Sequence, residues 1–191
     1  MVLLIDNYDS FSYNLYQLVG SIDPEIQVVR NDGLTIPEIE ALSPRRIILS
    51  PGPGKPSDSG ICEEVVRSFA GKIPMLGVCL GHQAICEVYG ATVSYARELM
   101  HGKQSEVTLD LTSPIFRGLP PKIPAARYHS LAALPDTVPE VLKIIGRTED
   151  GEVMAVQHRT FPVYGLQFHP ESILTPDGGI ILKNFLTGNS I

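Results

Sequence analysis

A cysteine lies between two glycines at the point where the sequence pattern changes from strand to helix. Cys79 has Gly77 and Gly81 two residues away on either side. The apolar run Met75–Val78 is typical of a buried strand, and residues 81–89 are predicted to form a helix. Small residues at this spacing permit a sharp turn that projects one side chain outward. Because a helix N-terminus favours a thiolate, the pattern predicts a nucleophile.

A buried structural cysteine is the alternative interpretation, since most isolated cysteines in reducing compartments are of that kind. Cys86 fits this description because it lies inside the predicted helix beside apolar residues. Cys79 differs from it through the flanking glycines. A nucleophile at Cys79 would also need a base.

The second chemical feature is a histidine followed two residues later by an acid. In an extended segment, residues two apart point to the same side, so His169 and Glu171 are expected to lie together, with Pro170 stiffening the chain between them. A carboxylate beside an imidazole fixes its tautomer and stabilises the imidazolium. A surface histidine without a role is the alternative, but none of the other four histidines has an acid at this spacing. Cys79, His169 and Glu171 are therefore the predicted catalytic set.

A loop rich in glycine and proline follows the predicted strand at residues 46–50. Residues 50–56 read Ser-Pro-Gly-Pro-Gly-Lys-Pro. Gly52 and Gly54, separated by Pro53, expose backbone N–H groups that can bind an anion or an oxyanion. A phosphate-binding loop would need serine or threonine after the lysine, and proline stands there instead. A tight turn without a binding role is the remaining alternative.

The elements that must position these groups alternate between strand and helix in the first half of the chain. The predicted strands are residues 2–6, 26–30, 46–50 and 75–78, and the predicted helices lie near residues 11–19, 35–42, 60–70 and 81–89. This alternation predicts a largely parallel sheet, with catalytic groups at the carboxyl ends of its strands. From residue 92 short apolar runs separated by turns predict a mixed or antiparallel extension. A strand at residues 163–168 then leads into His169, and a helix near residues 179–186 follows.

Composition narrows the class of protein. With 191 residues the chain is expected to form a single domain, residues 1–191. A net charge of −6 without a Lys/Arg cluster argues against a nucleic-acid partner. No apolar run approaches the ~18 residues of a membrane span, and the N-terminus lacks a basic leader, so we expect a cytoplasmic protein that does not bind membranes. Three cysteines without a CxxC motif and five scattered histidines predict neither a disulfide framework nor a metal site.

The combined motifs resemble those of the class I, triad-type glutamine amidotransferases. They are Gly-Val-Cys-Leu-Gly-His-Gln at 77–83, Ser-Pro-Gly-Pro-Gly at 50–54 and Phe-His-Pro-Glu at 168–171. Three further segments, at residues 6–14, 101–103 and 127–131, resemble the small subunits of anthranilate synthase and aminodeoxychorismate synthase. The resemblance spans the chain and leaves all three triad positions intact, which argues against a member that has only a regulatory or scaffolding role.

The resemblance implies a fold, a reaction and a set of contacts. The fold is α/β and flavodoxin-like, with a mostly parallel central sheet, flanking helices and a smaller antiparallel sheet extension. Cys79 would attack the side-chain amide of glutamine and release ammonia through a glutamyl thioester, while His169 shuttles protons and Glu171 orients it. The implied contacts with glutamine and its oxyanion are Gly52, Pro53, Gly54, Leu80, Gln83, Ser130 and Leu131.

The resemblance also implies a partner. Ammonia would pass to a chorismate-binding large subunit that makes anthranilate for tryptophan biosynthesis, or alternatively aminodeoxychorismate for folate biosynthesis, or both. The residues implied at that interface are Asn7, Asp9, Ser10, Phe11, His101, Lys103, Tyr128 and His129. No cofactor is expected in this chain. A free-standing cysteine hydrolase with the same three catalytic residues remains the alternative from another functional class.

Overall fold

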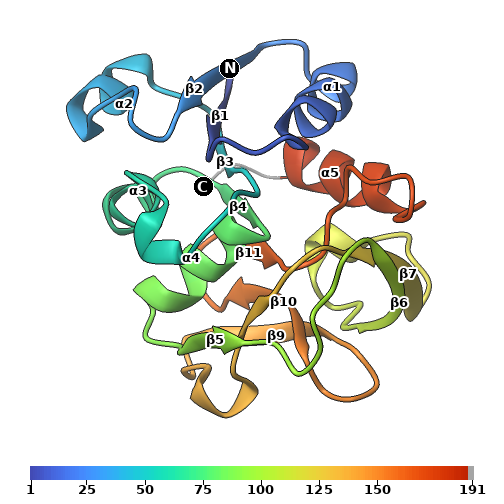
Figure 1. The fold of residues 1–191 in the computed structure, drawn as a ribbon. Coiled ribbons are helices and arrows are strands. Elements are labelled where there is room, and N and C mark those ends of the chain that lie inside the picture. Colours follow the sequence, from blue (N-terminus) through green and yellow to red (C-terminus); the bar gives the residue numbers. More distant parts are fainter. Residues whose placement is uncertain (189–191) are drawn as a thin grey trace.

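A mixed β-sheet runs through the centre of the computed structural model, which describes residues 1–188 (Figure 1). In chain order the strands are β1 (Val2–Asp6), β2 (Ile26–Arg30), β3 (Arg46–Leu49), β4 (Met75–Val78), β5 (Val93–Tyr95), β6 (Lys103–Leu109), β7 (Lys122–Arg127), β8 (Leu131–Ala133), β9 (Leu142–Arg147), β10 (Val153–His158) and β11 (Val163–Leu166). Nine of them form one sheet in the order β2-β1-β3-β4-β11-β10-β9-β6-β7, and β5 pairs with β8 separately.

The sheet changes character at β11. The neighbours β2, β1, β3, β4 and β11 are all parallel. Beyond β11 the neighbours β10, β9, β6 and β7 pair antiparallel, as do β5 and β8. The prediction of a parallel sheet with an antiparallel extension is confirmed. Five adjacent parallel strands bring their carboxyl ends to one edge, where a site can be assembled from several loops.

Helices cover both faces of the parallel half (Figure 1). On one face lie α1 (Ser12–Ile22) and α5 (Gly178–Thr187), and on the other lie α2 (Ile36–Leu42), α3 (Cys62–Phe69) and α4 (Leu80–Val88). Single turns of 3₁₀ helix occupy Pro56–Asp58, Pro114–Phe116 and Pro135–Thr137. Among the helices of residues 1–188, none combines the length and apolar character that crossing a membrane requires.

Strand β1 shows why the central strands are continuously apolar. Its alternate residues point to opposite faces, so Leu4 packs with Leu15 of α1 while Ile5 packs with Val65 of α3. Every residue of β1 is buried. A strand covered by helices on both sides needs apolar side chains on both faces, unlike a strand with one solvated face. In β1 these are residues 2–5, and the strand ends with the buried Asp6 at its carboxyl edge.

Most predicted boundaries agree with the structure, and the exceptions have local causes. Helix α2 begins after Thr35, whose side chain and that of Glu38 form a capping box. Helix α3 begins at Cys62 rather than residue 60 because Gly60, at φ 59°, forms a turn before it. Helix α4 begins at Leu80, one residue earlier than predicted, which places Cys79 directly at its N-terminus.

Candidate active site

Four loops meet at the carboxyl edge of the parallel sheet. They follow the adjacent strands β1, β3, β4 and β11, and they carry Asn7, Ser50, Cys79 and Gln167 respectively. These residues are far apart in the sequence. The strand order therefore brings the predicted nucleophile, the glycine-rich loop and the predicted base to the same edge.

The backbone at Cys79 forms a strained strand-to-helix turn. Its dihedral angles are φ 52° and ψ −101°, a conformation that non-glycine residues rarely adopt and that costs about 1–3 kcal/mol. The flanking glycines make the turn possible. A Cβ atom on Gly77 would lie 2.4 Å from the backbone of Gly81, and one on Gly81 would lie 2.4 Å from the carbonyl oxygen of Leu49. Cys79 is 8% exposed, whereas Cys62 and Cys86 are 0% exposed, so Cys79 is the most accessible of the three cysteines.

His169 and Glu171 form the pair that their spacing predicts. His169 Nδ1 lies 2.6 Å from Glu171 Oε1, and the two side chains are 3% and 1% exposed. Burial alone would lower the pKa of His169, but its interactions with Cys79 and Glu171 outweigh burial and raise the pKa to about 10. His169 is therefore an imidazolium at neutral pH, with a proton ready to donate.

Aromatic rings cover this pair. The Tyr128 ring meets the His169 ring edge-on at 4.9 Å, and the Phe11 ring does so at 5.8 Å. Phe11 and Tyr128 also pack against each other at 5.1 Å. Burial is the main reason that the pKa of Asp9 is raised, and the charges of His169 and Glu171 also affect this pKa because both residues are near. Phe11 and Tyr128, expected at a partner interface, thus also shield the imidazolium from water.

The glycine-rich loop packs directly against the N-terminus of α4. A Cβ atom on Gly52 would lie 2.5 Å from Asn7 Cβ and 2.9 Å from Leu80 Cδ2, so only glycine fits there. Gly52 therefore lies against the Leu80 side chain, which places the two residues predicted to supply the oxyanion donors next to each other. The next two residues, Pro53 and Gly54, are exposed.

Asn7 differs from the expectation that it faces a partner, because its side chain is buried at 3% exposure. Its Nδ2 donates to the Ser50 carbonyl at 2.8 Å, and its Oδ1 accepts from Asn31 Nδ2 at 3.0 Å and from Cys62 Sγ at 3.2 Å. The Asn7 backbone N–H donates to Ser50 Oγ. The side chain thus ties the loop after β1 to the glycine-rich loop, and it satisfies its polar atoms internally.

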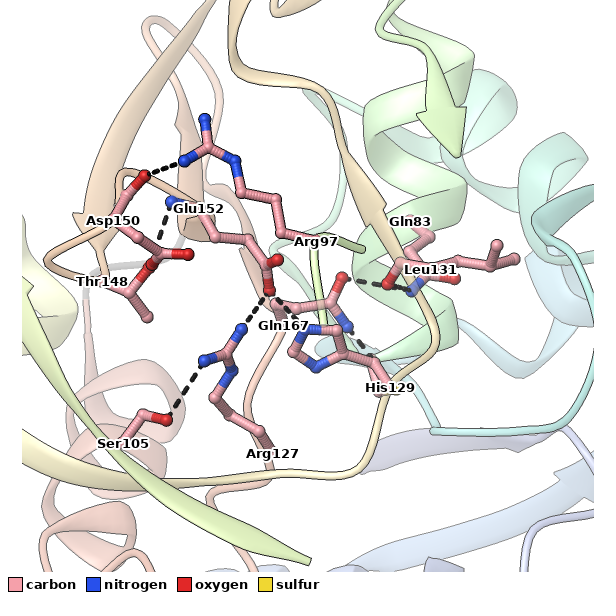
Figure 2. Close-up of polar contacts among 11 residues, drawn as sticks. Gln83, Arg97, Ser105, Arg127, His129, Leu131, Thr148, Asp150, Glu152 and Gln167 are labelled. Carbon is pink, nitrogen blue, oxygen red and sulfur yellow. Dashed lines mark hydrogen bonds and ion pairs between the residues drawn. The ribbon is translucent and has the colours of Figure 1, made fainter. Parts of the chain in front are cut away.

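Two side-chain amides lie next to Cys79. Gln83 Nε2 donates to the carbonyl oxygen of Leu131 at 2.9 Å and to Gln167 Oε1 at 3.1 Å (Figure 2). Gln167 Nε2 lies 3.6 Å from Cys79 Sγ. The structure therefore joins Gln83 to Leu131, two residues predicted to contact glutamine. Ser130, predicted with them, is exposed, and its carbonyl accepts from the Ala96 N–H.

His129 also differs from the expectation of a partner-facing residue. Its side chain is 1% exposed, and its Nε2 lies 2.5 Å from Glu152 Oε1, which also accepts from Arg127 (Figure 2). Burial would raise the pKa of Glu152, but His129 and Arg127 lower it below its ordinary value. This buried charged cluster fixes the segment that leads into Ser130 and Leu131.

The exposed rim beside the site is made by the remaining predicted interface residues. Ser10, His101 and Lys103 are exposed, and the turn between the last two packs on Tyr128, since a Cβ atom on Gly102 would lie 3.1 Å from that ring. Ile173 is 93% exposed on the adjoining segment. The residue before it, Ser172, places its Oγ 3.4 Å from Tyr128 Oη.

Sequence reasoning missed Gln167 and Ile173. Gln167 had a usable signal, because it stands two residues before His169 and so points to the same side of the extended chain. Its backbone N–H continues the sheet by donating to the Met154 carbonyl at 2.8 Å. Ile173 had no such signal, because only the fold reveals its exposure. Within residues 1–188, no group of three or more His, Cys, Asp or Glu side chains is arranged to hold a metal ion.

Comparison with known proteins identifies the family. Residues 3–189 match the family described as glutamine amidotransferase class-I. The chain belongs to this family. Within it, the chain is 50% identical over 186 residues to aminodeoxychorismate/anthranilate synthase component 2 of Bacillus subtilis, and the match covers 97% of this chain and 95% of that protein.

Two further comparisons concern a longer protein and a solved structure. The chain is 49% identical to the bifunctional protein TrpGD of Thermotoga maritima, where the match covers 97% of this chain but only 32% of that protein. A solved structure from Thermoplasma acidophilum, described as one subunit of a GMP synthase, superposes with a TM-score of 0.85. That likeness covers 97% of this chain and 91% of the other at 24% identity, and it supports the fold.

Proposed function

We propose that residues 1–191 form one glutaminase domain that serves as the glutamine amidotransferase component of anthranilate synthase. The observation that carries this proposal is the placement of Cys79 at the strained turn beside the buried His169–Glu171 pair. Membership of the class-I family and 50% identity to a component 2 protein support it. The name of that relative covers both syntheses, so aminodeoxychorismate synthase is the second candidate. The chain would then serve aminodeoxychorismate synthase in place of anthranilate synthase, or it would serve both.

In the proposed reaction, Cys79 attacks the side-chain amide carbon of glutamine. The backbone N–H groups of Gly52 and Leu80 stabilise the oxyanion that forms. The His169 imidazolium donates its proton to the departing nitrogen, which leaves as ammonia, and a glutamyl thioester remains on Cys79. The raised pKa of His169 supports this starting state.

Hydrolysis of the thioester completes the proposed cycle. Neutral His169 takes a proton from water, the hydroxide attacks the thioester carbon, and glutamate departs as the Cys79 thiolate is restored. Glu171 holds the ring through Nδ1, so that Nε2 faces the reacting atoms, and stabilises the charge each time the ring is protonated. The amino acid end of glutamine is proposed to lie against Gln83 and the backbone of Ser130 and Leu131, with Pro53 and Gly54 bordering it.

Ammonia is proposed to pass to a chorismate-binding large subunit that docks on the rim around Tyr128. Exposed Ser10, His101, Lys103 and Ile173 lie around this ring, and Ile173, at 93% exposure, offers an apolar side chain that a partner would bury. Asp9, Phe11 and Tyr128 lie between the rim and His169. Docking there would therefore press on groups that contact the proposed proton carrier.

The test measures glutaminase activity of the purified chain alone, with each candidate large subunit, and with chorismate. We expect low activity alone and a marked rise with the correct subunit, and analysis of the aromatic product distinguishes anthranilate from aminodeoxychorismate. Equal rates under all conditions, with no complex in native mass spectrometry, would contradict the partner and favour a free-standing hydrolase.

A further inference from the structure

Gln167 is buried at 0% exposure, and its amide nitrogen lies 3.6 Å from the sulfur of Cys79. An amide side chain can present either a donor or an acceptor, and the two ends look alike in outline. The effect of Gln167 on the Cys79 thiolate therefore depends on whether its NH₂ group or its oxygen faces the sulfur. A donor stabilises a thiolate, whereas an acceptor opposes one.

The hydrogen-bond chain around Gln167 fixes this choice. The carbonyl oxygen of Leu131 can only accept, so the group of Gln83 that lies 2.9 Å from it must be the NH₂ group. That same NH₂ group lies 3.1 Å from the Gln167 amide, which must therefore present its oxygen to Gln83. The NH₂ group of Gln167 is then left to face the sulfur of Cys79.

We propose that Gln167 is a further catalytic residue, whose amide donates a hydrogen bond to the Cys79 thiolate in an orientation dictated by the Leu131 carbonyl through Gln83. The catalytic part of this proposal rests on the proposed role of Cys79 as the nucleophile, whereas the hydrogen bond to the sulfur does not. Hydrogen bonds to charged groups are the stronger ones, and a buried donor that faces a thiolate keeps its full effect because water does not compete. Two amides thus connect the predicted glutamine-binding segment to the reacting atom.

Several other titratable groups lie on the segments that pack around Cys79. His169 interacts with it directly, and Glu171 and Asp9 lie behind His169. On α4, His82 is fully buried, and burial lowers its pKa to about 3, so it stays neutral. His129, with Glu152 and Arg127, lies at the start of the Ser130–Leu131 segment. Since the imidazolium of His169 also favours the thiolate, the contribution of Gln167 must be separated from it by substitution.

The experiment follows alkylation of Cys79 by iodoacetamide as a function of pH, with the labelled residue identified by mass spectrometry. Cys62 and Cys86 are both 0% exposed, so Cys79 is the cysteine that reacts in the folded protein. Gln167→Met keeps a similar volume and removes the donor. We expect alkylation at pH 7 to slow about tenfold and the pH midpoint to rise by about one unit.

The plateau rate above the midpoint separates an electrostatic role from a packing role. A thiolate that has lost a donor is more basic and no less nucleophilic, so the plateau should be unchanged or higher in Gln167→Met. A uniform fall in rate with the wild-type midpoint would overturn the proposal. Gln157→Met on the neighbouring strand β10 is the matched control and should keep the wild-type profile.

Two further variants test the chain of amides. Gln83→Met alone should raise the midpoint by less than Gln167→Met, because Gln167 is then freed to rotate, and it should add nothing in the Gln167→Met background. Additive shifts would overturn the relay through Gln83. If Gln167→Met fails to fold, Gln167→Asn retains the amide one methylene short of the sulfur and should show the same direction of shift.

The alkylation profile needs no glutamine, so it is independent of the proposed function. A shifted midpoint in a chain that never forms a thioester with glutamine would refute the glutaminase proposal and leave the donor role standing. Normal thioester formation with glutamine, together with an unshifted alkylation midpoint in Gln167→Met, would refute the donor role and leave the glutaminase proposal standing.

Discussion

Cys79 is the residue on which the proposed reaction depends, and a single substitution tests it. We expect Cys79→Ser to abolish glutamine-dependent synthesis by the complex while ammonia-dependent synthesis continues, because serine keeps the shape but is not ionised at neutral pH. Cys86→Ala is the control, because Cys86 lies in the core. This substitution should lower the free energy of unfolding by about 1 kcal/mol and leave glutamine-dependent synthesis unchanged. Full glutamine-dependent activity in Cys79→Ser would exclude the assignment.

The His169–Glu171 pair predicts a pH dependence of stability. The pKa of His169 in the folded state is about 10, above its ordinary value of 6.5, so its proton stabilises the fold. This contribution is complete below about pH 6.5 and is lost as the pH rises through about 10. Cys79 and Glu171 both raise the pKa of His169, and Glu171→Gln removes the charge of the second. The variant should therefore begin to lose stability at lower pH than the wild-type protein. Urea unfolding of the wild-type protein and of Glu171→Gln between pH 6 and 10 measures the two free energies of unfolding. The same pH dependence in both proteins would contradict the prediction.

The same pair predicts an order of catalytic damage. His169→Asn removes the group that carries the proton, whereas Glu171→Gln keeps a partner for Nδ1 and loses only its charge. We therefore expect the glutaminase rate to fall further in His169→Asn than in Glu171→Gln. Single-turnover labelling of Cys79 separates formation of the thioester from its hydrolysis. Equal losses in the two variants would give Glu171 a larger role than orientation.

Among the elements, the strand-to-helix turn at Cys79 could be predicted from the sequence because its requirements are local. Gly77 and Gly81 are needed at that spacing, and the structure adds the reason, which is contact between the two glycine backbones and with Leu49 of β3. The capping box of α2 and the contact between His169 and Glu171 are local in the same sense. Patterns within a few residues were sufficient for all three.

Gly81 gives a prediction about this turn. A Cβ atom there meets the Leu49 carbonyl oxygen at 2.4 Å, and neither backbone can move without disturbing the sheet. We expect Gly81→Ala to lower the free energy of unfolding by about 3 kcal/mol, measured by urea denaturation. The control is Gly20→Ala in helix α1, where the nearest atom is 3.7 Å from the added Cβ, and it should be neutral or stabilising by up to about 1 kcal/mol. A mild Gly81→Ala would show that the turn can relax.

At the scale of the whole molecule, the sequence could not predict which polar residues are internal. Asn7 and His129 stand in segments that look solvated, yet both are buried, because Ser50 and Asn31 surround the first and Glu152 the second. These partners are 23 to 43 residues away in the sequence. Only the strand order brings them together, and the same order places Gln167 next to Cys79.

The exposed rim predicts where a large subunit binds. We expect Ile173→Glu to weaken the complex by about thirtyfold in Kd while the free energy of unfolding is unchanged, because the side chain is 93% exposed beside the Tyr128 rim. Leu111→Glu is the matched control. Leu111 is 44% exposed and follows β6, whose opposite end carries Lys103 of the rim. Calorimetric titration with the large subunit measures both, and an unchanged Kd for Ile173→Glu would place the interface elsewhere.

Both ends of the described chain meet on the side of the sheet opposite to Cys79. The carbonyl oxygen of Met1 accepts from the Arg45 N–H, and the guanidinium of Arg46, at the start of β3, donates to the carbonyl oxygens of Phe185 and Gly188. The backbone at residues 1 and 188 therefore lies at the end of the parallel strands that is opposite to the reacting sulfur. A longer chain that continued from these residues would leave the molecule away from Cys79, and the relative in Thermotoga maritima, of which the match covers 32%, is a longer chain.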